Sequence, residues 1–389
     1  MFDYDYGFTE DQLALRDLAR KIAEEKVRPV AAKYDESEEF PWPVMKIFAD
    51  AGLFGVYIGE EYGGTGGGVT DLCICAEEIS RACGGIATAY AASALGTFPI
   101  LLTGNDAQKK KYLPDIASGK RIAAFGLTEP GAGSDAGGIT STAKKEGDFY
   151  VLNGLKQWIT NAGEAEIYTV VALTDKAKGP RGASAFIVEK DTPGFSFGKK
   201  EKKMGIRCSA TRELIFENCR IPKENLLGRE GAGFLATMKT FDAARPGVAA
   251  QAVGIAEGAL DLAVNYSRER RQFGKPICSF QGVQFMLADM AAQVEAAKSL
   301  TYAAARATDK KHPAASAIAS MAKFFASDAA MKVTTDAVQV YGGYGYMRDY
   351  PVEKMMRDAK ITQIYEGTNQ IQREVVALEL IKEAARKAR

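Results

Sequence analysis

The sequence predicts a mainly α-helical protein with a central β domain, in the order helical, β, helical. Apolar residues recur at helical spacing from Thr9 to about Gly119, short β-type runs occupy about Ile122 to Asn225, and the helical period returns after Gly233. A chain of 389 residues exceeds the usual size of one hydrophobic core, so several domains are expected. We place their boundaries at residues 1–121, 122–231 and 232–389.

The N-terminal domain is predicted to be helical because its apolar residues recur every three to four positions. Thr9 and Gln12 have the spacing of a capping box, in which two side chains satisfy backbone N–H groups at a helix start. The glycine-rich stretch Gly63–Gly68 follows no predicted strand and lacks the spacing of phosphate-binding loops. We therefore expect it to connect two helices.

The middle domain is predicted to be a small antiparallel β-barrel or sandwich. Its β-type runs are short and separated by Pro/Gly turns; the clearest are Ile122–Leu127, Tyr150–Leu152, Tyr168–Leu173 and Ala185–Val188. These runs do not alternate with long helices, as the strands of a parallel Rossmann sheet do. A nicotinamide-dinucleotide fold is therefore disfavoured.

The C-terminal domain is predicted to be an antiparallel four-helix bundle. Four long segments have apolar faces at helical spacing, roughly 232–268, 279–308, 313–341 and 368–388. The most apolar tract, 247–264, is interrupted by three polar or charged residues, Gln251, Glu257 and Asp261. We interpret this tract as a buried helix and not as a membrane span.

Composition argues against several classes of function. The 50 Lys and Arg residues balance 49 Asp and Glu residues, a net charge of +1, which does not provide the basic surface of a nucleic-acid-binding protein. The six cysteines lack the spacing of a disulfide framework, and Cys73 and Cys75 lack the two-residue gap of zinc knuckles. The first six residues resemble neither a secretory signal nor a transit peptide. We expect a cytoplasmic protein with free thiols, no metal, and no membrane or nucleic-acid partner.

One carboxylate is the candidate catalytic base. The single histidine, His312, lies in a polar run, so acid–base chemistry falls to other groups. Glu366 stands between Tyr365 and Gly367, immediately before a predicted helix. We predict that Glu366 is the base; a glutamate that only interacts with the dipole of the following helix would show the same local pattern.

Five motifs occur in order along the chain: Gly126–Asp135, Gln157–Asn161, Glu269–Gly274, Gln339–Gly343 and Ile364–Thr368. Together they resemble the acyl-CoA dehydrogenase family, especially its short- and medium-chain, butyryl-like branch, over nearly the whole chain from Leu13 to Ile381. The resemblance implies an FAD flavoprotein whose β domain lies between two helical domains. It also implies a homotetramer built as a dimer of dimers.

The resemblance implies two groups of FAD contacts. Around the flavin it places Phe125, Leu127, Thr128, Gly133, Ser134, Trp158, Ile159 and Thr160, and it also assigns Thr368 and Gln370 to the cofactor. Against the ADP part of FAD held by a neighbouring subunit it places Arg270, Phe273, Gln281, Gln339, Gly342 and Gly343. From the residues alone, the Gly/Pro segment before Ser134 fits an ordinary turn equally well, and Trp158 fits a core position.

The resemblance also implies an acyl-CoA site. Its members are Ser134, Phe241, Asp242, Arg245, Tyr365 and Gly367 along the CoA channel and the base, and Tyr90, Ala91, Thr97 and Phe98 at the closed end of the acyl pocket. Bulky Tyr90 and Phe98 would exclude long chains, while Ala91 leaves width for a branched or alicyclic group. Without the resemblance, Asp242 and Arg245 are i and i+3 neighbours that could form a simple surface ion pair.

Two further positions indicate which branches of the family the chain resembles. Some branches of the family carry the base at the position of Ala244, and alanine cannot do that work. The position where glutaryl-CoA dehydrogenases carry a carboxylate-binding arginine corresponds to Ile86, which argues against a dicarboxylate substrate. Glutamate at 366 with alanine at 244 therefore resembles the short- and medium-chain arrangement more than the isovaleryl or long-chain one.

The reaction implied by the resemblance is α,β-dehydrogenation of a short or medium, branched or alicyclic acyl-CoA to the 2-enoyl-CoA. Glu366 would take the α-proton, its backbone N–H and a ribityl hydroxyl of FAD would bond to the thioester oxygen, and the β-hydrogen would pass as hydride to flavin N5. An electron-transferring flavoprotein would accept the electrons. Three alternatives stay open: an acyl-CoA oxidase or an enoyl-CoA reductase on the same fold, and a CoA-ester-binding subunit without catalysis.

Overall fold

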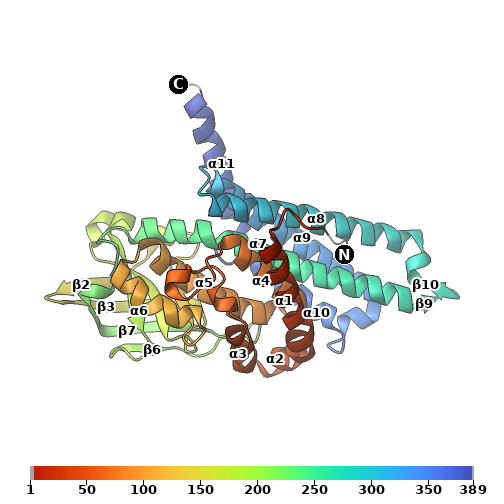
Figure 1. The fold of residues 1–389 in the computed structure, drawn as a ribbon, viewed down its shortest axis with the longest axis horizontal. Coiled ribbons are helices and arrows are strands. Elements are labelled where there is room, and N and C mark those ends of the chain that lie inside the picture. The colour runs from red at the N-terminus through yellow and green to blue at the C-terminus, as the bar shows by residue number, and fades with distance from the viewer. Residues whose placement is uncertain (1–3, 388–389) are drawn as a thin grey trace.

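The computed structural model describes residues 4–387 and has the helical, β, helical order that the sequence predicts (Figure 1). The N-terminal helices are α1 Glu10–Ile22, α2 Ala31–Ser37, α3 Trp42–Asp50, α4 Val69–Ala82, α5 Gly84–Thr103 and α6 Asp106–Ala117. The predicted capping box is confirmed at the start of α1, where Thr9 Oγ1 accepts from Gln12 N–H and Gln12 Oε1 accepts from Thr9 N–H, each at 3.2 Å. The stretch Gly63–Gly68 leads into α4, as predicted.

One sheet of eight strands forms the middle domain. Its strands are β1 Ala123–Gly126, β2 Thr142–Glu146, β3 Phe149–Thr160, β4 Ile167–Leu173, β5 Ala183–Glu189, β6 Phe195–Phe197, β7 Thr211–Pro222 and β8 Leu226–Leu227. The order is β6-β7-β3-β2-β4-β5-β8, with β1 paired to β4. Most neighbours are antiparallel, as predicted, but β1 runs parallel to β4, and β2 meets β4 in parallel at one residue pair. The runs of β-forming residues mark strands but do not give their direction.

A bulge in β3 prepares part of the functional site. The register between β3 and β7 shifts between Lys156 and Ile159, and Trp158 inside this segment has φ 58°. A bulge turns a side chain out of the regular alternation of a strand. Trp158 accordingly has 56% of its surface exposed, although its neighbour Ile159 is buried.

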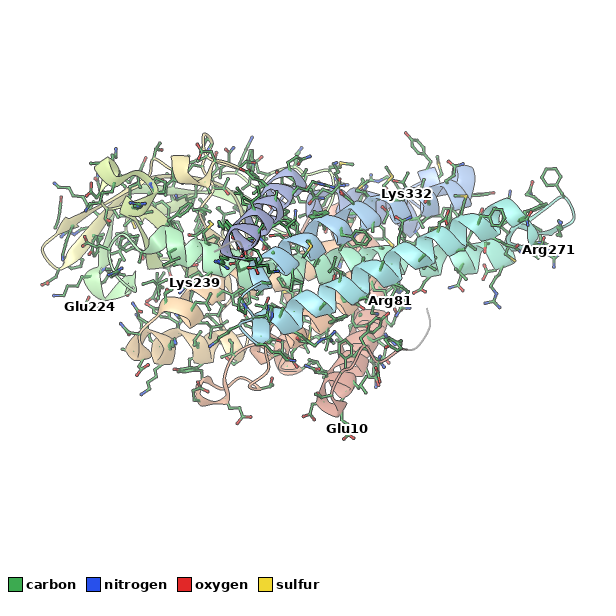
Figure 2. All side chains as sticks on the ribbon, turned by 90° about the horizontal axis from the view of Figure 1, so that it is seen from above. Glu10, Arg81, Glu224, Lys239, Arg271 and Lys332 are labelled. Carbon is green, nitrogen blue, oxygen red and sulfur yellow. The ribbon has the colours of Figure 1, made fainter. Side chains whose placement is uncertain are left out.

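The C-terminal domain consists of α7 Gly233–Glu269, α8 Gln281–Asp309, α9 Ala315–Tyr341, α10 Pro351–Thr362 and α11 Asn369–Lys387. Strands β9 Arg271–Gln272 and β10 Lys275–Pro276 form a hairpin at the far tip of the long helices (Figure 2). The predicted four-helix bundle is confirmed, but its fourth helix is α10 and not the predicted segment 368–388. Helix α10 packs on α7 and α9 and contributes to their shared core, whereas α11, the predicted fourth helix, packs on α9 at its start and then projects away from the body (Figure 1).

Helix α7 joins the domains because small residues let other helices approach its backbone. A Cβ on Gly254 would lie 2.1 Å from the Glu77 carbonyl oxygen of α4, and one on Gly258 would lie 2.3 Å from the Arg81 carbonyl oxygen. Such close packing requires glycine at both positions. Helices α5 and α7 are long and apolar enough to span a membrane by composition, but most of each apolar window is buried inside the protein, as in core helices.

Candidate active site

A cavity of about 530 Å³ lies where the three domains meet. Helix α5, the segment after β1, the β3 bulge, α7 and the turn before α11 all contribute to its wall. The residues predicted to contact flavin that line it are Phe125, Leu127, Thr128, Gly133, Ser134, Trp158, Ile159 and Thr160. The residues predicted to contact substrate or to act as base that line it are Ala91, Phe98, Phe241, Arg245, Tyr365, Glu366 and Gly367. Segments far apart in the sequence thus meet at one site.

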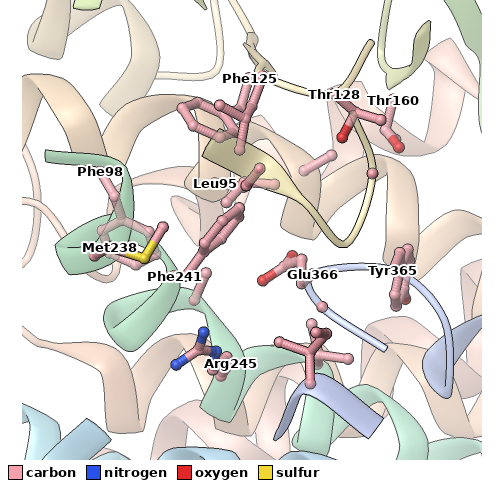
Figure 3. A pocket seen from close by; sticks show the side chains of 18 of the residues that line it. Leu95, Phe98, Phe125, Thr128, Thr160, Met238, Phe241, Arg245, Tyr365 and Glu366 are labelled. Atoms are coloured by element: carbon pink, nitrogen blue, oxygen red, sulfur yellow. The ribbon is translucent and has the colours of Figure 1, made fainter. Parts of the chain in front are cut away.

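Glu366 lies in the turn between α10 and α11, and its carboxylate points into the cavity toward α7, where Phe241 and Arg245 lie (Figure 3). Its backbone has φ 53°, and Gly367 follows with φ 91°. Within residues 4–387, Glu366 Oε2 has no hydrogen-bond partner, and the Glu366 N–H donates no hydrogen bond. Both groups therefore remain available for a bound molecule.

The environment of Glu366 favours a neutral carboxyl group. Burial raises its pKa from 4.5 to about 7, against the opposing pull of the cations Lys323 and Arg245. A pKa close to neutral is what a general base needs, because the group can then both take up and release a proton. Two cations moderate the effect of burial here.

Arg245 is the buried cation on the α7 side of the cavity. Its side chain is 6% exposed, and Nη1 donates to Asp242 Oδ1 at 2.9 Å and to Ser320 Oγ at 3.3 Å. The simple ion pair is thus present, but it is buried on the arginine side and not a surface pair. Asp242 does not line the cavity; it accepts from Arg245 and from Ser316 and so holds the guanidinium in place.

A polar chain runs along another wall of the cavity. Tyr365 donates to Gln251 Oε1, and Gln251 Nε2 donates to Thr88 Oγ1 at 2.5 Å. Thr88 in turn donates to the Gly84 carbonyl oxygen at 2.8 Å. These bonds fix the ring of Tyr365 beside Glu366 and join helices α5 and α7.

A buried ion pair supports the loop that leads to Gly133 and Ser134. Lys156 Nζ, in β3, donates to Glu129 Oε1 at 2.7 Å and to the Leu127 carbonyl oxygen at 3.0 Å. Glu129 Oε2 also accepts from Thr140 N–H at 2.6 Å. Lys156 and Glu129 therefore fix the loop behind the wall on which Thr128 lies.

Some predicted site residues lie elsewhere. Tyr90, predicted at the closed end of the acyl pocket, does not line this cavity: its ring packs against Phe48 and Phe54 in the N-terminal core, and its hydroxyl donates to the Leu53 carbonyl oxygen at 2.8 Å. Thr97 is also buried outside the cavity. Outside it as well lie Thr368, whose backbone oxygen accepts from Gln372 N–H, and the exposed Gln370.

A second cavity of about 450 Å³ lies near the β9–β10 hairpin. Arg270, Gly342 and Gly343 line it, as does the stacked pair Tyr266 and Tyr341. The other residues predicted to contact ADP are exposed nearby: Phe273 (93% exposed), Gln281 and Gln339. On helix α7 the nearest lining residues are Gln251 of the first cavity and Tyr266 of the second, so about 22 Å of helix separates the two cavities.

The structure adds residues that sequence reasoning missed. On α7 they are Phe234, Met238 and Val248, which continue the face of Phe241 and Arg245 at steps of three and four. On α5, Thr88 and Leu95 continue the face of Ala91 in the same way. Extending each predicted residue along its helix would have found these positions. Leu72 of α4 had no such signal because it comes from another helix.

Comparison with known proteins gives a consistent answer. Residues 9–120, 124–219 and 231–381 match the N-terminal, middle and C-terminal domains of acyl-CoA dehydrogenase. An acyl-CoA dehydrogenase of Bacillus subtilis is 49% identical over 374 residues, covering 96% of this chain and 98% of the relative. The chain belongs to the acyl-CoA dehydrogenase family. The enzyme is therefore an FAD-dependent oxidoreductase.

Three further relatives show to which members of the family this dehydrogenase is similar. A short-chain-specific acyl-CoA dehydrogenase of Clostridium acetobutylicum is 48% identical, covering 96% of this chain and 98% of the relative. Butyryl-CoA dehydrogenase from Megasphaera elsdenii superposes with TM-score 0.94 at 47% identity, covering 98% and 100% of the two chains. A chain in a structure of the electron transferring flavoprotein of Acidaminococcus fermentans superposes with TM-score 0.95 at 51% identity, covering 97% and 99%.

The first cavity of this acyl-CoA dehydrogenase fits a flavin. A Cβ on Gly133 would meet no atom within 4 Å, so backbone and open space are offered to a ligand at this loop. The exposed indole of Trp158 provides an aromatic face, and Thr128 and Thr160 provide hydroxyl groups beside it. An apolar wall with a few convergent polar groups is typical of cofactor sites.

Proposed function

We propose that this acyl-CoA dehydrogenase converts a short or medium, branched or alicyclic acyl-CoA to its 2-enoyl-CoA, with Glu366 as the catalytic base. The observation that supports the proposal most strongly is the unpaired, buried Glu366 carboxylate in the same cavity as the flavin-contacting candidates. The pKa of Glu366, raised by burial to about 7, suits removal of a weakly acidic α-proton.

Residues of the chain divide the work around Glu366. Its carboxylate accepts the α-proton, and its free N–H donates to the thioester oxygen as negative charge develops there. Arg245 adds a cation on the same side, and apolar residues such as Phe241 exclude water, which strengthens each of these interactions. FAD, when bound at Thr128, Trp158 and Thr160, supplies the acceptor for the β-hydrogen.

The expected substrate size follows from the wall of the cavity. Ala91, Leu95 and Phe98 of α5 and Leu72 of α4 provide an apolar end that holds a short hydrocarbon chain. The similarity to short-chain-specific and butyryl-CoA dehydrogenases supports the same substrate class. Because Tyr90 lies outside the cavity, Phe98 is the bulky residue of that pair left to limit chain length.

Electron transfer and assembly complete the proposal. We assign an electron-transferring flavoprotein as the electron acceptor, supported by the similarity to the chain in the Acidaminococcus structure. We also assign a homotetramer in the cytoplasm, supported by the similarity to other acyl-CoA dehydrogenases. Arg270, Gly342 and Gly343 would then contact the ADP part of a neighbour's FAD.

An anaerobic titration tests the function. The purified holoenzyme is mixed with butyryl-, octanoyl-, isobutyryl-, glutaryl- and cyclohexanecarboxyl-CoA, and loss of flavin colour is recorded. A short or branched acyl-CoA should bleach the flavin, and glutaryl-CoA should not. If none of the five bleaches it, a CoA-ester-binding role without dehydrogenation is favoured instead.

Glu366→Gln tests the base. The amide keeps the size of the side chain but cannot take a proton, so the rate of flavin reduction should fall about 100- to 10,000-fold while flavin stays bound. Stopped-flow absorbance measures the rate, and Glu374→Gln on the exposed part of α11 is the matched control. Rapid reduction in Glu366→Gln would show that another group is the base.

Reoxidation of the reduced enzyme in air separates a dehydrogenase, which reoxidises slowly, from an oxidase.

A further inference from the structure

The turn that carries Glu366 has a backbone conformation that contacts from other parts of the chain must stabilise. Glu366 with φ 53° and Gly367 with φ 91° lie consecutively in the left-handed region. A residue with a side chain rarely adopts this conformation, and it persists where surrounding contacts fix it. The contacts behind the turn therefore decide where the carboxylate points.

Lys323 provides the most direct of these contacts. It lies on α9, its side chain is completely buried, and Nζ donates to the Gly367 carbonyl oxygen at 2.8 Å and to Asn369 Oδ1 at 3.0 Å. One ammonium group thus joins the turn to the first residue of α11. Asn369 is held in addition by Ser327, one helical turn along α9.

Gln372 completes the support from α11. Its Nε2 donates to the Glu366 carbonyl oxygen at 3.0 Å and to the Gly367 carbonyl oxygen at 3.2 Å. Both carbonyl groups are thereby bound on the side away from the cavity. The carboxylate and N–H of Glu366 stay on the cavity side, free of protein partners within the described chain.

Lys323 also interacts with Glu366 through its charge. The charged groups around it are Glu366, Arg245 of α7 and Asp328 of α9. Asp328 is already bonded by Arg373, Gln363 and Asn369, so Glu366 is the carboxylate left without a bonded partner among these groups. Burial lowers the pKa of Lys323 to about 7, against the pull of Glu366. Lys323 does not line the cavity and so acts through Glu366.

We propose that Lys323 is a positioning residue for the reaction: it fixes the Glu366–Gly367 turn by hydrogen bonds and, in its protonated form, presents a positive charge to the Glu366 carboxylate from behind. The inference rests on the proposed function, in which Glu366 is the base. It assigns two separable effects to one side chain, a donor effect on geometry and a charge effect on the proton affinity of the base.

Two variants of the holoenzyme separate these effects. Lys323→Met removes both donor and charge, and Lys323→Gln keeps a donor without the charge. Anaerobic stopped-flow reduction by butyryl-CoA is measured from acid to alkaline pH, together with the thermal midpoint. Lys332→Met is the matched control, because Lys332 lies on the same helix with its side chain 59% exposed.

Loss of a cation beside a carboxylate favours the neutral acid, so Lys323→Met should move the acid limb of the rate profile up by about one pH unit. Its plateau rate should fall at least about tenfold, because the turn is no longer held. Lys323→Gln should show the same shift of the acid limb but a plateau closer to that of the parent. Lys332→Met should match the parent in both.

Three results would overturn the inference. One is an acid limb of the rate profile of Lys323→Gln at the same pH as in the parent enzyme. This comparison also tests the inference if Lys323→Met fails to bind flavin. Another is a lower thermal midpoint with an unchanged rate profile, the result of a purely structural lysine. The third is rapid reduction of Glu366→Gln, which removes the base itself; this result alone contradicts the proposed function as well.

Discussion

As the proposed catalytic base, Glu366 should set the pH at which the enzyme works. Its pKa is raised by burial to about 7, and only the ionised carboxylate can take a proton. The rate of flavin reduction should therefore rise with pH through about 7 and fall about tenfold per pH unit well below it. Stopped-flow reduction of the holoenzyme at saturating butyryl-CoA measures this profile. An acid limb near the ordinary carboxyl value of 4.5 would mean that burial does not act on the base as described.

At this scale, the sequence motifs located the site but not every side-chain direction. Ala91 and Tyr90 are neighbours on α5, yet the helix turns about 100° between them, so Ala91 lines the cavity and Tyr90 points into the core. Lys323, in contrast, was missed altogether. Nothing near it in the sequence marks it, because its role depends on a turn more than 40 residues later.

At the scale of elements, the Lys156–Glu129 pair joins β3 to the loop that leads to Gly133 and Ser134. Burial raises the pKa of Glu129, but the charge and hydrogen bond of Lys156, with bonds from Ser141 and Thr140, outweigh it and hold the pKa at about 2. Burial lowers the pKa of Lys156 to about 8. The carboxylate thus stabilises the fold above pH 4.5 and loses this effect between pH 4.5 and 2. The lysine shift opposes folding at neutral pH, so the intact pair contributes little net stability.

Breaking this pair should nevertheless be costly. Lys156→Met leaves the Glu129 carboxylate buried without its cation, which should destabilise the folded protein by about 3–5 kcal/mol. Flavin should also dissociate more readily, because the loop is no longer fixed. Thermal unfolding and flavin release measure the two effects. The double variant Glu129→Gln/Lys156→Met should recover much of the loss; if it is no better than Lys156→Met, the unpaired charge is not the cause.

Element boundaries were predictable where local chemistry sets them. The capping box at Thr9 is an example, since both of its partners lie within four residues. Helix α10 carried a readable signal, with Pro351 at its first turn and buried Val352, Met355 and Ala359 at helical spacing. The bulge at Trp158 carried none, because a bulge follows from the pairing of two strands and not from one strand alone.

At the scale of the whole molecule, the last turns of α11 leave apolar side chains exposed. Its pattern predicted an apolar face, but the pattern could not show that the start of the helix packs on α9 and lines the cavity through Ile371 and Val375 while the later turns stay exposed. Leu378 and Ile381, one helical turn apart, are 47% and 66% exposed on the part of the helix that projects from the body (Figure 1). Apolar groups exposed together in this way are typical of an interface with another copy.

Charged residues on this face should prevent assembly. Leu378→Glu with Ile381→Glu places two carboxylates where burial against a second chain is expected, so the tetramer should dissociate. Analytical ultracentrifugation measures the change, and flavin bound per chain should fall with it. Glu374→Gln, on the same helix, should alter neither quantity. A variant that stays tetrameric would place the interface elsewhere.

The distance along α7 between the two cavities has a consequence for handling the protein. If Arg270, Gly342 and Gly343 contact the FAD of a neighbouring chain, as proposed, retention of the yellow cofactor depends on the concentration of assembled chains. Yellow colour per milligram should then fade on dilution and return on concentration, so that dilute preparations look inactive although every polypeptide in them is intact.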